Sequence, residues 1–428
     1  MRKKILLIAY YWPPGGGIAV RRWMGLANAL CRNGVEVHVL TIDPASAAYQ
    51  HLDESLADEI ETNIVVHRVK AFNPFAVIKK VAPSAIPGAA FAESKSSGLL
   101  GRMLTVLRSH LFIPDPRKTW VHKAVQKGCA LVDKHGLQTV ITTSPPQSVQ
   151  LIGQGIKRAR PKVQWMADFR DPWTDIFYYE RLGHSLLSRR IDAAMERSVL
   201  QQADDVLAVS WGFRDLLASK VEPEHQGKFH VLTNGMDFDP VDLENDSRNQ
   251  DGPFRIVHTG TIAPSYAPDL VFDAIAALNA GGEHRPFEFD YYGSISAEYQ
   301  KELEEQYDFI RFQGFVGQNQ IGAIQRAADV LFLLGPDVEK SKGHIPGKLF
   351  EYMGALRPIT FLGNPSDDVA RILSETQTGV CLPRGDARAI REALVHLQGA
   401  ASNAENVIAN LQPYIRSNQA QRLLDLLG

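Results

Sequence analysis

Short runs of consecutive apolar residues recur along the first half of the chain. The first, at residues 5–9, is followed by a glycine loop and then by apolar residues at helical spacing between Val20 and Leu30. Continuous runs of this kind are typical of strands buried on both faces of a parallel sheet. Further runs lie at residues 35–40, 64–67, 139–142, 163–166 and 206–209. The pattern predicts a doubly wound α/β domain over residues 1–233.

A second series of apolar runs begins after residues 243–252, a polar segment typical of a linker or an exposed loop. The runs lie at residues 256–258, 287–292, 310–312, 330–334, 359–362 and 379–382, with helical patterns at 269–279 and 321–328. We therefore expect a second Rossmann-like α/β domain over residues 234–410. Ligands are expected at the carboxyl ends of both parallel sheets, and the active site in the cleft between the domains.

Composition fits a globular protein of two or three domains, since the 428 residues are 45% hydrophobic and 22% charged. The three cysteines are far apart and form no CxxC pair, which suggests neither disulfides nor a zinc site and fits a reducing compartment. The apolar run near the amino terminus is too short for a signal peptide, and no run reaches membrane-spanning length. We expect a cytoplasmic protein whose membrane contact, if any, is peripheral.

Positive charge is concentrated in one part of the chain. Net charge is −2, but residues 68–127 carry +9, and Leu100, Met103, Leu104, Leu107 and Leu111 recur there at helical spacing. A basic amphipathic segment is typical of contact with an anionic membrane surface. We therefore expect a possible peripheral contact of the protein with the inner face of the cytoplasmic membrane. The alternative is an ordinary helix packed on its own domain. Nucleic-acid binding is disfavoured, because aromatic residues are not interleaved with the basic ones.

The segment 344–354 predicts an anion site in the second domain. Pro346 suits the first turn of a helix, which places Lys348 near the positive end of the helix dipole. A lysine there suggests a bound diphosphate, and Glu351, one turn later, is placed to accept hydrogen bonds from ribose hydroxyls. The alternative is an incidental Lys–Glu pair on a surface helix.

Two segments of the first domain carry candidate chemistry. Gly16 and Gly17 allow close backbone approach to a ligand, and Arg21 and Arg22 follow early in the next helix, against the dipole preference. The segment 167–173, with sequence ADFRDPW, places three charged residues beside two aromatic ones where a strand ends. We interpret this second cluster as functional, whereas the glycine loop alone is also explained by a tight turn.

The order of these segments resembles that of a known family. YYWPPGGG, TTSPPQS, DFRDPWTD, VLTNGMD, HTGT and PGKLFEYMGALRPI together resemble family 4 glycosyltransferases of the two-Rossmann GT-B type, and in particular bacterial members that build surface polysaccharides on lipid carriers. The resemblance covers essentially the whole chain. It implies retaining transfer of a sugar from a UDP- or GDP-sugar, bound on the second domain, to a glycan or lipid-linked acceptor. It also implies that helix 411–428 crosses back to the first domain.

The resemblance also assigns donor-binding residues. These are Thr259, Gly260, Tyr292, Gly293, Phe315, Val316, His344, Lys348, Leu349, Phe350 and Glu351, together with Gly16 and Gly17 of the first domain. Glu351 matches the second glutamate of the E-x7-E motif, but Gly343 stands where the first glutamate belongs. His344 or Glu339 are the available substitutes. The basic pair usually found after the glycine turn is also missing, so the phosphate charge would fall to Lys348, with Lys342, Arg21 or Arg22 as candidates for support.

The implied mechanism is a front-face displacement in which the departing diphosphate takes the proton of the acceptor. Arg170 stands where the family often has a catalytic histidine and would lie near the sugar, while Asp168 or Asp171 would position the acceptor hydroxyl. No metal and no cofactor are expected, and the D-x-D string at residues 237–239 is not interpreted as a metal site.

Two other functions remain open. One is a non-catalytic partner that binds nucleotide-sugars within a polysaccharide assembly complex, which the departures at Gly343 and after Gly260 make conceivable. The other is a nucleotide-sugar epimerase on a similar fold. Turnover of donor that requires an acceptor distinguishes the transferase from both.

Overall fold

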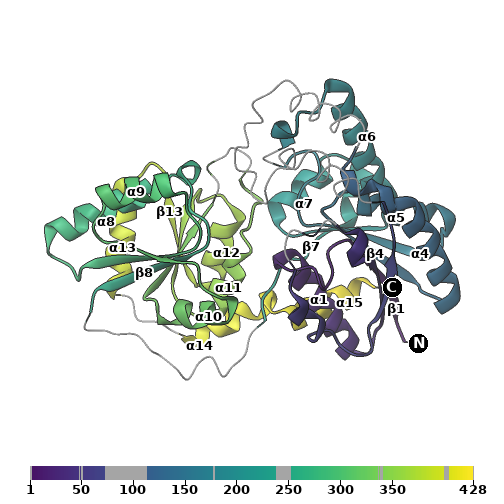
Figure 1. Ribbon diagram of the computed structural model, residues 1–428, viewed down its shortest axis with the longest axis horizontal. Coiled ribbons are helices and arrows are strands. Elements are labelled where there is room, and N and C mark those ends of the chain that lie inside the picture. Colours follow the sequence, from purple (N-terminus) through teal and green to yellow (C-terminus); the bar gives the residue numbers. More distant parts are fainter. Residues whose placement is uncertain are drawn as a thin grey trace. The chain divides into compact units, whose positions relative to one another are not determined.

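The computed structural model describes residues 2–47, 49, 52–72, 113–176, 179–237, 252–335, 337, 341–399 and 404–427 (Figure 1). The basic amphipathic segment at 100–111, Glu339 and Asp239 lie outside these ranges. The chain divides into two compact units. The first comprises Met1–Thr233 together with Gln419–Gly428, and the second comprises Asn234–Asn418.

A seven-stranded parallel sheet forms the centre of the first unit. Its strands are β1 (Lys4–Ala9), β2 (Glu36–Ile42), β3 (Val65–Val69), β4 (Thr139–Ser144), β5 (Gln164–Phe169), β6 (Asp205–Ala208) and β7 (Phe229–Val231). They are ordered β3-β2-β1-β4-β5-β6-β7, so the direction of winding reverses between β1 and β4. Ligands of doubly wound sheets bind outside the carboxyl ends of the strands at such a reversal.

Helices cover both faces of this sheet (Figure 1). The α-helices are α1 (Ile18–Arg32), α4 (Val121–His135), α5 (Ser148–Ala159), α6 (Leu186–Gln202), α7 (Trp211–Ala218) and α15 (Arg416–Leu426). Alternate residues of β1 enter two separate cores: Leu6 and Ile8 pack with α4 and α5, whereas Ile5 and Leu7 pack with α1 and α15. Burial of both faces explains the unbroken apolar run.

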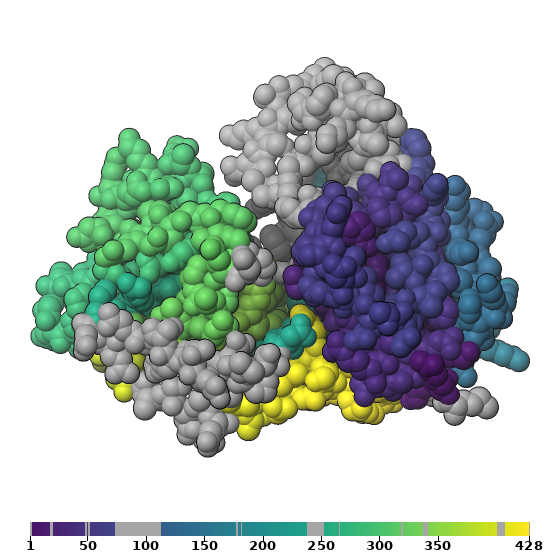
Figure 2. Space-filling model, turned by 60° about the horizontal axis from the view of Figure 1, so that its bottom comes forward, coloured from purple at the N-terminus to yellow at the C-terminus, as the bar shows by residue number. Residues whose placement is uncertain are grey.

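The end of the chain is part of the first core. Ala420 and Leu423 of α15 are fully buried among the residues of α1, and Lys3 Nζ donates a hydrogen bond to the Leu424 carbonyl oxygen at 2.8 Å. Figure 2 shows this yellow segment against the purple amino-terminal residues. The first unit is therefore completed by residues about two hundred positions away from the rest of it.

The second unit repeats the same architecture with six parallel strands. They are β8 (Phe254–Thr259), β9 (Phe287–Tyr292), β10 (Ile310–Gly314), β11 (Val330–Leu334), β12 (Ile359–Gly363) and β13 (Gly379–Pro383), ordered β10-β9-β8-β11-β12-β13. Its α-helices are α8 (Asp269–Gly281), α9 (Ala297–Gln306), α10 (Gln318–Ala327), α11 (Lys348–Gly354), α12 (Asp368–Thr376), α13 (Ala387–Gly399) and α14 (Ala404–Leu411). Its reversal of winding lies between β8 and β11.

The expected fold class, two Rossmann-like domains with parallel sheets, is confirmed. Six strands of the first sheet have the same topology as the six strands of the second, and the first sheet adds β7 at its edge. Among the described residues, no helix is both long enough and apolar enough to cross a membrane.

Candidate functional site

Two glycines bring the carboxyl ends of β8 and β9 close together. The Gly260 amide donates to the Tyr292 carbonyl oxygen at 2.7 Å, and a Cβ added to Gly293 would lie 1.8 Å from the Gly260 carbonyl oxygen. Both residues have positive φ, +143° at Gly260 and +154° at Gly293. A side chain at either position would clash or strain the backbone, so the close approach requires glycine.

The ammonium of Lys348 lies directly beside Gly260, the first of these two glycines. A Cβ added to Gly260 would be 1.6 Å from Lys348 Nζ, which shows how closely the lysine covers the end of β8. Lys348 is the first residue of α11 and is half-buried. Burial lowers the pKa of Lys348, and the nearby Glu351 carboxylate acts in the opposite direction. The arrangement holds a partly desolvated cation beside the half-buried backbone of Gly260, which suits an anionic ligand such as a diphosphate.

Buried side chains fix the position of β8 and α11 beneath Lys348. The Thr259 amide donates to the Tyr352 hydroxyl oxygen at 2.9 Å, and His258 Nδ1 hydrogen-bonds to the Phe332 carbonyl oxygen at 2.7 Å. Burial raises the pKa of Tyr352 to about 12. Burial, with the nearby charge of Lys348, lowers the pKa of His258 to about 4. Both side chains are therefore neutral near pH 7 and act as a rigid support.

Other residues assigned to the donor occupy less direct positions. Leu349 and Phe350 are buried in the core, and their amides donate to the Pro346 and Gly347 carbonyl oxygens at 3.0 and 3.2 Å. These two amides are thus engaged in the turn that starts α11, a use the sequence pattern did not reveal. The His344 amide donates to the Ser341 carbonyl oxygen at 2.7 Å.

The segment after β10 lies next to the paired glycines. The Gly293 amide donates to the Gly314 carbonyl oxygen at 3.0 Å, which places Phe315 and Val316 just beyond this contact. Phe315 is 84% exposed, an unusual state for a large aromatic side chain and one that suits stacking against a planar ligand. The sheet therefore brings Gly260, Gly293 and the residues after Gly314 to a single edge.

In the first unit, Asp168 and Arg22 form a buried ion pair. Arg22 Nη1 lies 2.7 Å from Asp168 Oδ2, and the two side chains are 1% and 0% exposed. The same oxygen accepts hydrogen bonds from Trp23 Nε1 and Thr143 Oγ1, each at 2.7 Å, while Arg22 Nη2 donates to the Leu232 carbonyl oxygen. The expectation from sequence was a separate role for each of the two residues. In the structure they bind each other, so phosphate support by Arg22 and acceptor positioning by Asp168 stay predictions.

The guanidinium of Arg170 is held at the carboxyl ends of β4 and β5. Its Nε donates to the Ser144 carbonyl oxygen at 3.2 Å and its Nη2 to the Pro145 carbonyl oxygen at 2.6 Å. Burial lowers the pKa of Arg170, although the neighbouring Asp171 carboxylate opposes this effect. The side chain is half-buried and fixed rather than extended into solvent, as expected of a residue that presents charge at a defined place.

The glycine loop after β1 has a separate geometry. Gly17 caps the amino terminus of α1 with φ +96°, and a Cβ on Gly16 would approach the Asp53 Cβ to 3.1 Å. Arg21 lies 3.7 Å from Glu59 in a largely solvated pair. Of the two arginines, Arg21 rather than Arg22 keeps its charge near solvent.

The sequence pattern did not reveal a polar network around the loop after β5, the strand that precedes Arg170. Lys220 Nζ binds both oxygens of Glu196 at 2.7 Å and Asp175 at 2.6 Å, and Trp173 Nε1 donates to Asp192 at 2.6 Å. These contacts tie the loop after β5 to α6. The partners are dispersed between residues 173 and 220, and no local spacing connects them.

Comparison with known proteins agrees with this architecture. Residues 16–235 match the glycosyl transferase 4-like domain, and residues 253–399 match glycosyl transferases group 1. No curated protein matches the sequence significantly.

Solved structures share the fold at low sequence identity. Sucrose-phosphate synthase from Thermosynechococcus elongatus is 16% identical with a TM-score of 0.61, over 99% of this chain and 98% of that one. WaaG, a glycosyltransferase involved in lipopolysaccharide biosynthesis, is 15% identical with a TM-score of 0.53, over 99% of each chain. A putative UDP-N-acetylglucosamine 2-epimerase from Listeria monocytogenes is 11% identical with a TM-score of 0.54, over 99% of this chain and 95% of that one.

The two parallel-sheet domains have the GT-B fold, which enzymes of more than one class share. The chain belongs to the glycosyl transferase 4-like family of GT-B glycosyltransferases. The recognition of this family from sequence is confirmed to that level. As a glycosyltransferase, the protein binds a nucleotide-sugar donor and an acceptor.

Proposed function

We propose that this protein transfers a sugar, with retention and without a metal, from a UDP- or GDP-sugar to a glycan acceptor during surface polysaccharide biosynthesis. The observation that supports it best is the ammonium of Lys348 beside Gly260 at the carboxyl end of β8. There the lysine would neutralise charge on the donor diphosphate and stabilise it further as it departs. Glu351 would accept from the ribose, and Phe315 would contact the base.

In the first unit, Arg170 would present positive charge near the transferred sugar. With no carboxylate assigned as nucleophile, the departing diphosphate would take the acceptor proton on the same face of the sugar. Asp171 would then orient the acceptor hydroxyl, whereas Asp168 would act mainly through Arg22 and the position of β5. The lipid-linked nature of the acceptor and contact with an anionic membrane rest on the resemblance and on the basic stretch at 68–127. WaaG provides one example of this fold in lipopolysaccharide biosynthesis.

The donor site is tested by thermal unfolding with UDP, GDP, ADP and CDP, each with and without magnesium. A ligand at one hundred times its dissociation constant stabilises a protein by about 2.7 kcal/mol. We expect one diphosphate to stabilise the wild type without magnesium and to lose most of this effect in Lys348→Met, which retains the aliphatic stem. Lys301→Met, on the exposed surface of α9, is the matched control and should respond like the wild type.

Turnover then separates the three functions. The transferase is supported if the nucleoside diphosphate is released only when a glycan acceptor is present and the product retains the anomeric configuration of the donor. Conversion of the donor without acceptor indicates an epimerase, and binding without turnover indicates a non-catalytic partner. Equal stabilisation of wild type and Lys348→Met would contradict the assignment of the diphosphate to Lys348.

A further inference from the structure

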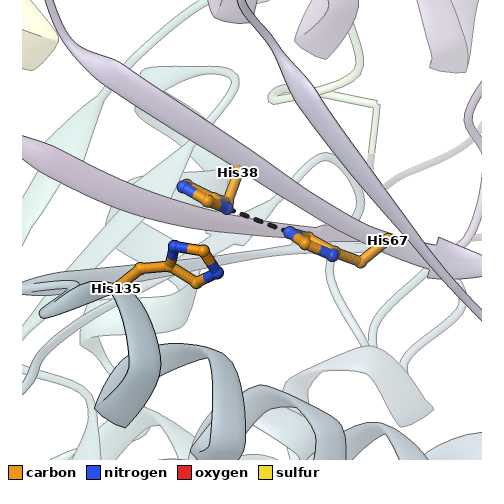
Figure 3. Close-up of side chains that lie close together, drawn as sticks. All are labelled: His38, His67 and His135. Atoms are coloured by element: carbon orange, nitrogen blue, oxygen red, sulfur yellow. Dashed lines mark hydrogen bonds between the residues drawn. The ribbon is translucent and has the colours of Figure 1, made fainter.

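Three histidines of the first unit meet at a place that the proposed reaction does not use. His38 lies in β2, His67 in β3 and His135 at the end of α4 (Figure 3). One ring nitrogen from each can be chosen so that all three lie within 4.8 Å of one another. Since His38 is the third residue of β2 and His135 ends a helix, the cluster is remote from the strand ends that carry Gly16 and Arg170.

Strand register and helix packing bring these side chains together. In the pairing of β2 with β3, Leu40 is opposite His67 and Val65 is opposite His38, so both histidines project from the same face of the sheet. Helix α4 packs on that face through Leu131 and Val132, which share a core with Leu40. Its last residue, His135, therefore arrives over the two strands, with its ring centroid 4.3 Å from that of His38.

The hydrogen bonds define which nitrogen of His38 faces the cluster. His38 Nε2 lies 3.2 Å from Glu36 Oε1, so this nitrogen carries the proton and donates it to the carboxylate. His38 Nδ1 then has a lone pair directed at His67 Nε2, 2.9 Å away. A carboxylate that accepts from the outer nitrogen of a histidine is the usual second partner of a metal-binding imidazole.

His135 adds a nitrogen that needs a partner. Its Nε2 is buried and has no hydrogen-bond partner within the described part of the chain. Burial lowers the pKa of His135, and burial together with the neighbouring His38 lowers the pKa of His67 to about 4. Both rings are consequently neutral near pH 7, the form in which imidazole binds metals.

Charged groups around the cluster act in both directions. Glu36 contributes negative charge, and the carboxyl end of α4 contributes the negative end of its dipole. Lys4 lies 3.3 Å from Glu36 and donates to the His135 carbonyl oxygen at 3.2 Å. Lys127 and Lys134 also face His67 and disfavour added positive charge, but both are exposed and therefore screened by solvent.

We propose that His38, His67 and His135 form a binding site for Zn²⁺, with His38 supported by Glu36. Zinc–nitrogen bonds of about 2.0–2.1 Å in a tetrahedron separate the ligand nitrogens by roughly 3.3 Å, so the rings need only modest adjustment from their present spacing. His67 would bind through Nε2 after its proton moves to Nδ1. The metal would join the edge strand β3, strand β2 and helix α4, and so act on stability rather than on sugar transfer.

The test uses the full-length protein, stripped of metal with a chelator and then dialysed. Titration of Zn²⁺ against a competing indicator should show one site with a submicromolar dissociation constant. Co²⁺ in its place should give the intense visible absorption of a four-coordinate ion. We expect His67→Asn and His135→Gln, both of half-buried residues, each to weaken zinc binding at least about 100-fold. His122→Gln, on the exposed side of α4, should bind as the wild type does.

Weak zinc binding by the wild type, or unchanged binding by the His67→Asn/His135→Gln double variant, would overturn the proposal and leave an ordinary hydrogen-bonded histidine stack. Circular dichroism of each variant checks that it is folded. Stabilisation by the donor nucleotide should be the same with and without zinc, because Lys348 belongs to the second unit. Failure of the zinc site and failure of the donor site are therefore separate results.

Discussion

The pKa of the buried His258 imidazole depends in part on the charge of Lys348 in the candidate donor site. His258 lies two residues before Gly260, its pKa is lowered to about 4, and burial is the larger cause, followed by the charge of Lys348. In the unfolded chain the same group titrates near 6.5. The folded protein therefore resists a proton that the unfolded chain accepts. The contribution of His258 to stability is constant above pH 6.5 and becomes steadily less favourable as the pH decreases from 6.5 to about 4.

His258→Asn should reduce this loss of stability in acid. Asparagine retains a donor for the Phe332 carbonyl oxygen but does not titrate. We expect the free energy of unfolding of the wild type to fall between pH 6.5 and 4 by about 1 to 3 kcal/mol more than that of the variant, since one pKa unit corresponds to about 1.4 kcal/mol. Urea unfolding at several pH values measures the difference. His284→Asn, at an exposed position, is the control, and parallel curves for wild type and His258→Asn would contradict the prediction.

The sequence indicated candidate site residues where the signal was local. Lys348 was noticed because proline, glycine and glutamate stand within a few positions of it, and Gly260 because it lies in the HTGT string that resembles the family. The pairing of Arg22 with Asp168 was missed, since 146 positions separate them and only the adjacency of α1, β4 and β5 brings them together. The histidine cluster was missed for the same reason. Cysteine spacing gave no sign of zinc, and the histidines lie 29 and 68 residues apart.

At the scale of elements, the paired turns after β8 and β9 depend on glycine. We expect Gly293→Ala to reduce both stability and nucleotide binding, because its Cβ would be 1.8 Å from the Gly260 carbonyl oxygen and φ is +154°. To accommodate the alanine Cβ, β8 and β9 would have to move apart, or the backbone would be strained by about 1–3 kcal/mol. Thermal unfolding with and without the bound diphosphate measures both effects.

Gly281→Ala is the matched control for this prediction. Gly281 is the last residue of α8, and a Cβ there meets nothing within 4 Å. Alanine should therefore leave nucleotide binding unchanged. Because alanine favours the helix more than glycine does, it should raise the free energy of unfolding by roughly a few tenths of a kcal/mol. If Gly293→Ala binds nucleotide like Gly281→Ala, the close approach of the two turns is not needed for the site.

The central strands were predictable because they are short, apolar and buried on both faces. In the described part of the chain, twelve of the thirteen strands correspond to apolar runs, and two of these, at 287–292 and 330–334, agree in both bounds. The missing strand is β7, which has only three residues, Phe229–Val231, and lies at the edge of its sheet. The start of α11 at Lys348 also departs from the pattern, since Pro346 suggested an earlier first turn. Local turn bonds to Pro346 and Gly347, rather than propensity, define that boundary.

At the scale of the whole molecule, the last turns of the chain complete the first core. Leu423→Ala should destabilise the first unit by about 2 to 5 kcal/mol, since this fully buried side chain packs with α1. Differential scanning calorimetry with the bound diphosphate distinguishes the units, because the ligand raises only the transition of the second one. The neighbouring Arg422→Ala, at an exposed position, should have little effect. A Leu423→Ala protein as stable as Arg422→Ala would show that α15 is dispensable.

The path of the chain between the units has a practical consequence. It leaves the first unit after Thr233 and returns at Gln419, so the second unit is inserted into the first. The two connections are paired where they enter the second unit: the Met236 amide donates to the Tyr414 carbonyl oxygen at 2.8 Å, and the Arg416 amide donates back to Met236 at 2.9 Å. Residues 234–418 are therefore a cassette with adjacent ends. If the second unit binds the donor as proposed, exchanging this cassette between relatives should give hybrid enzymes with a new donor preference, and the same junction suits circular permutation.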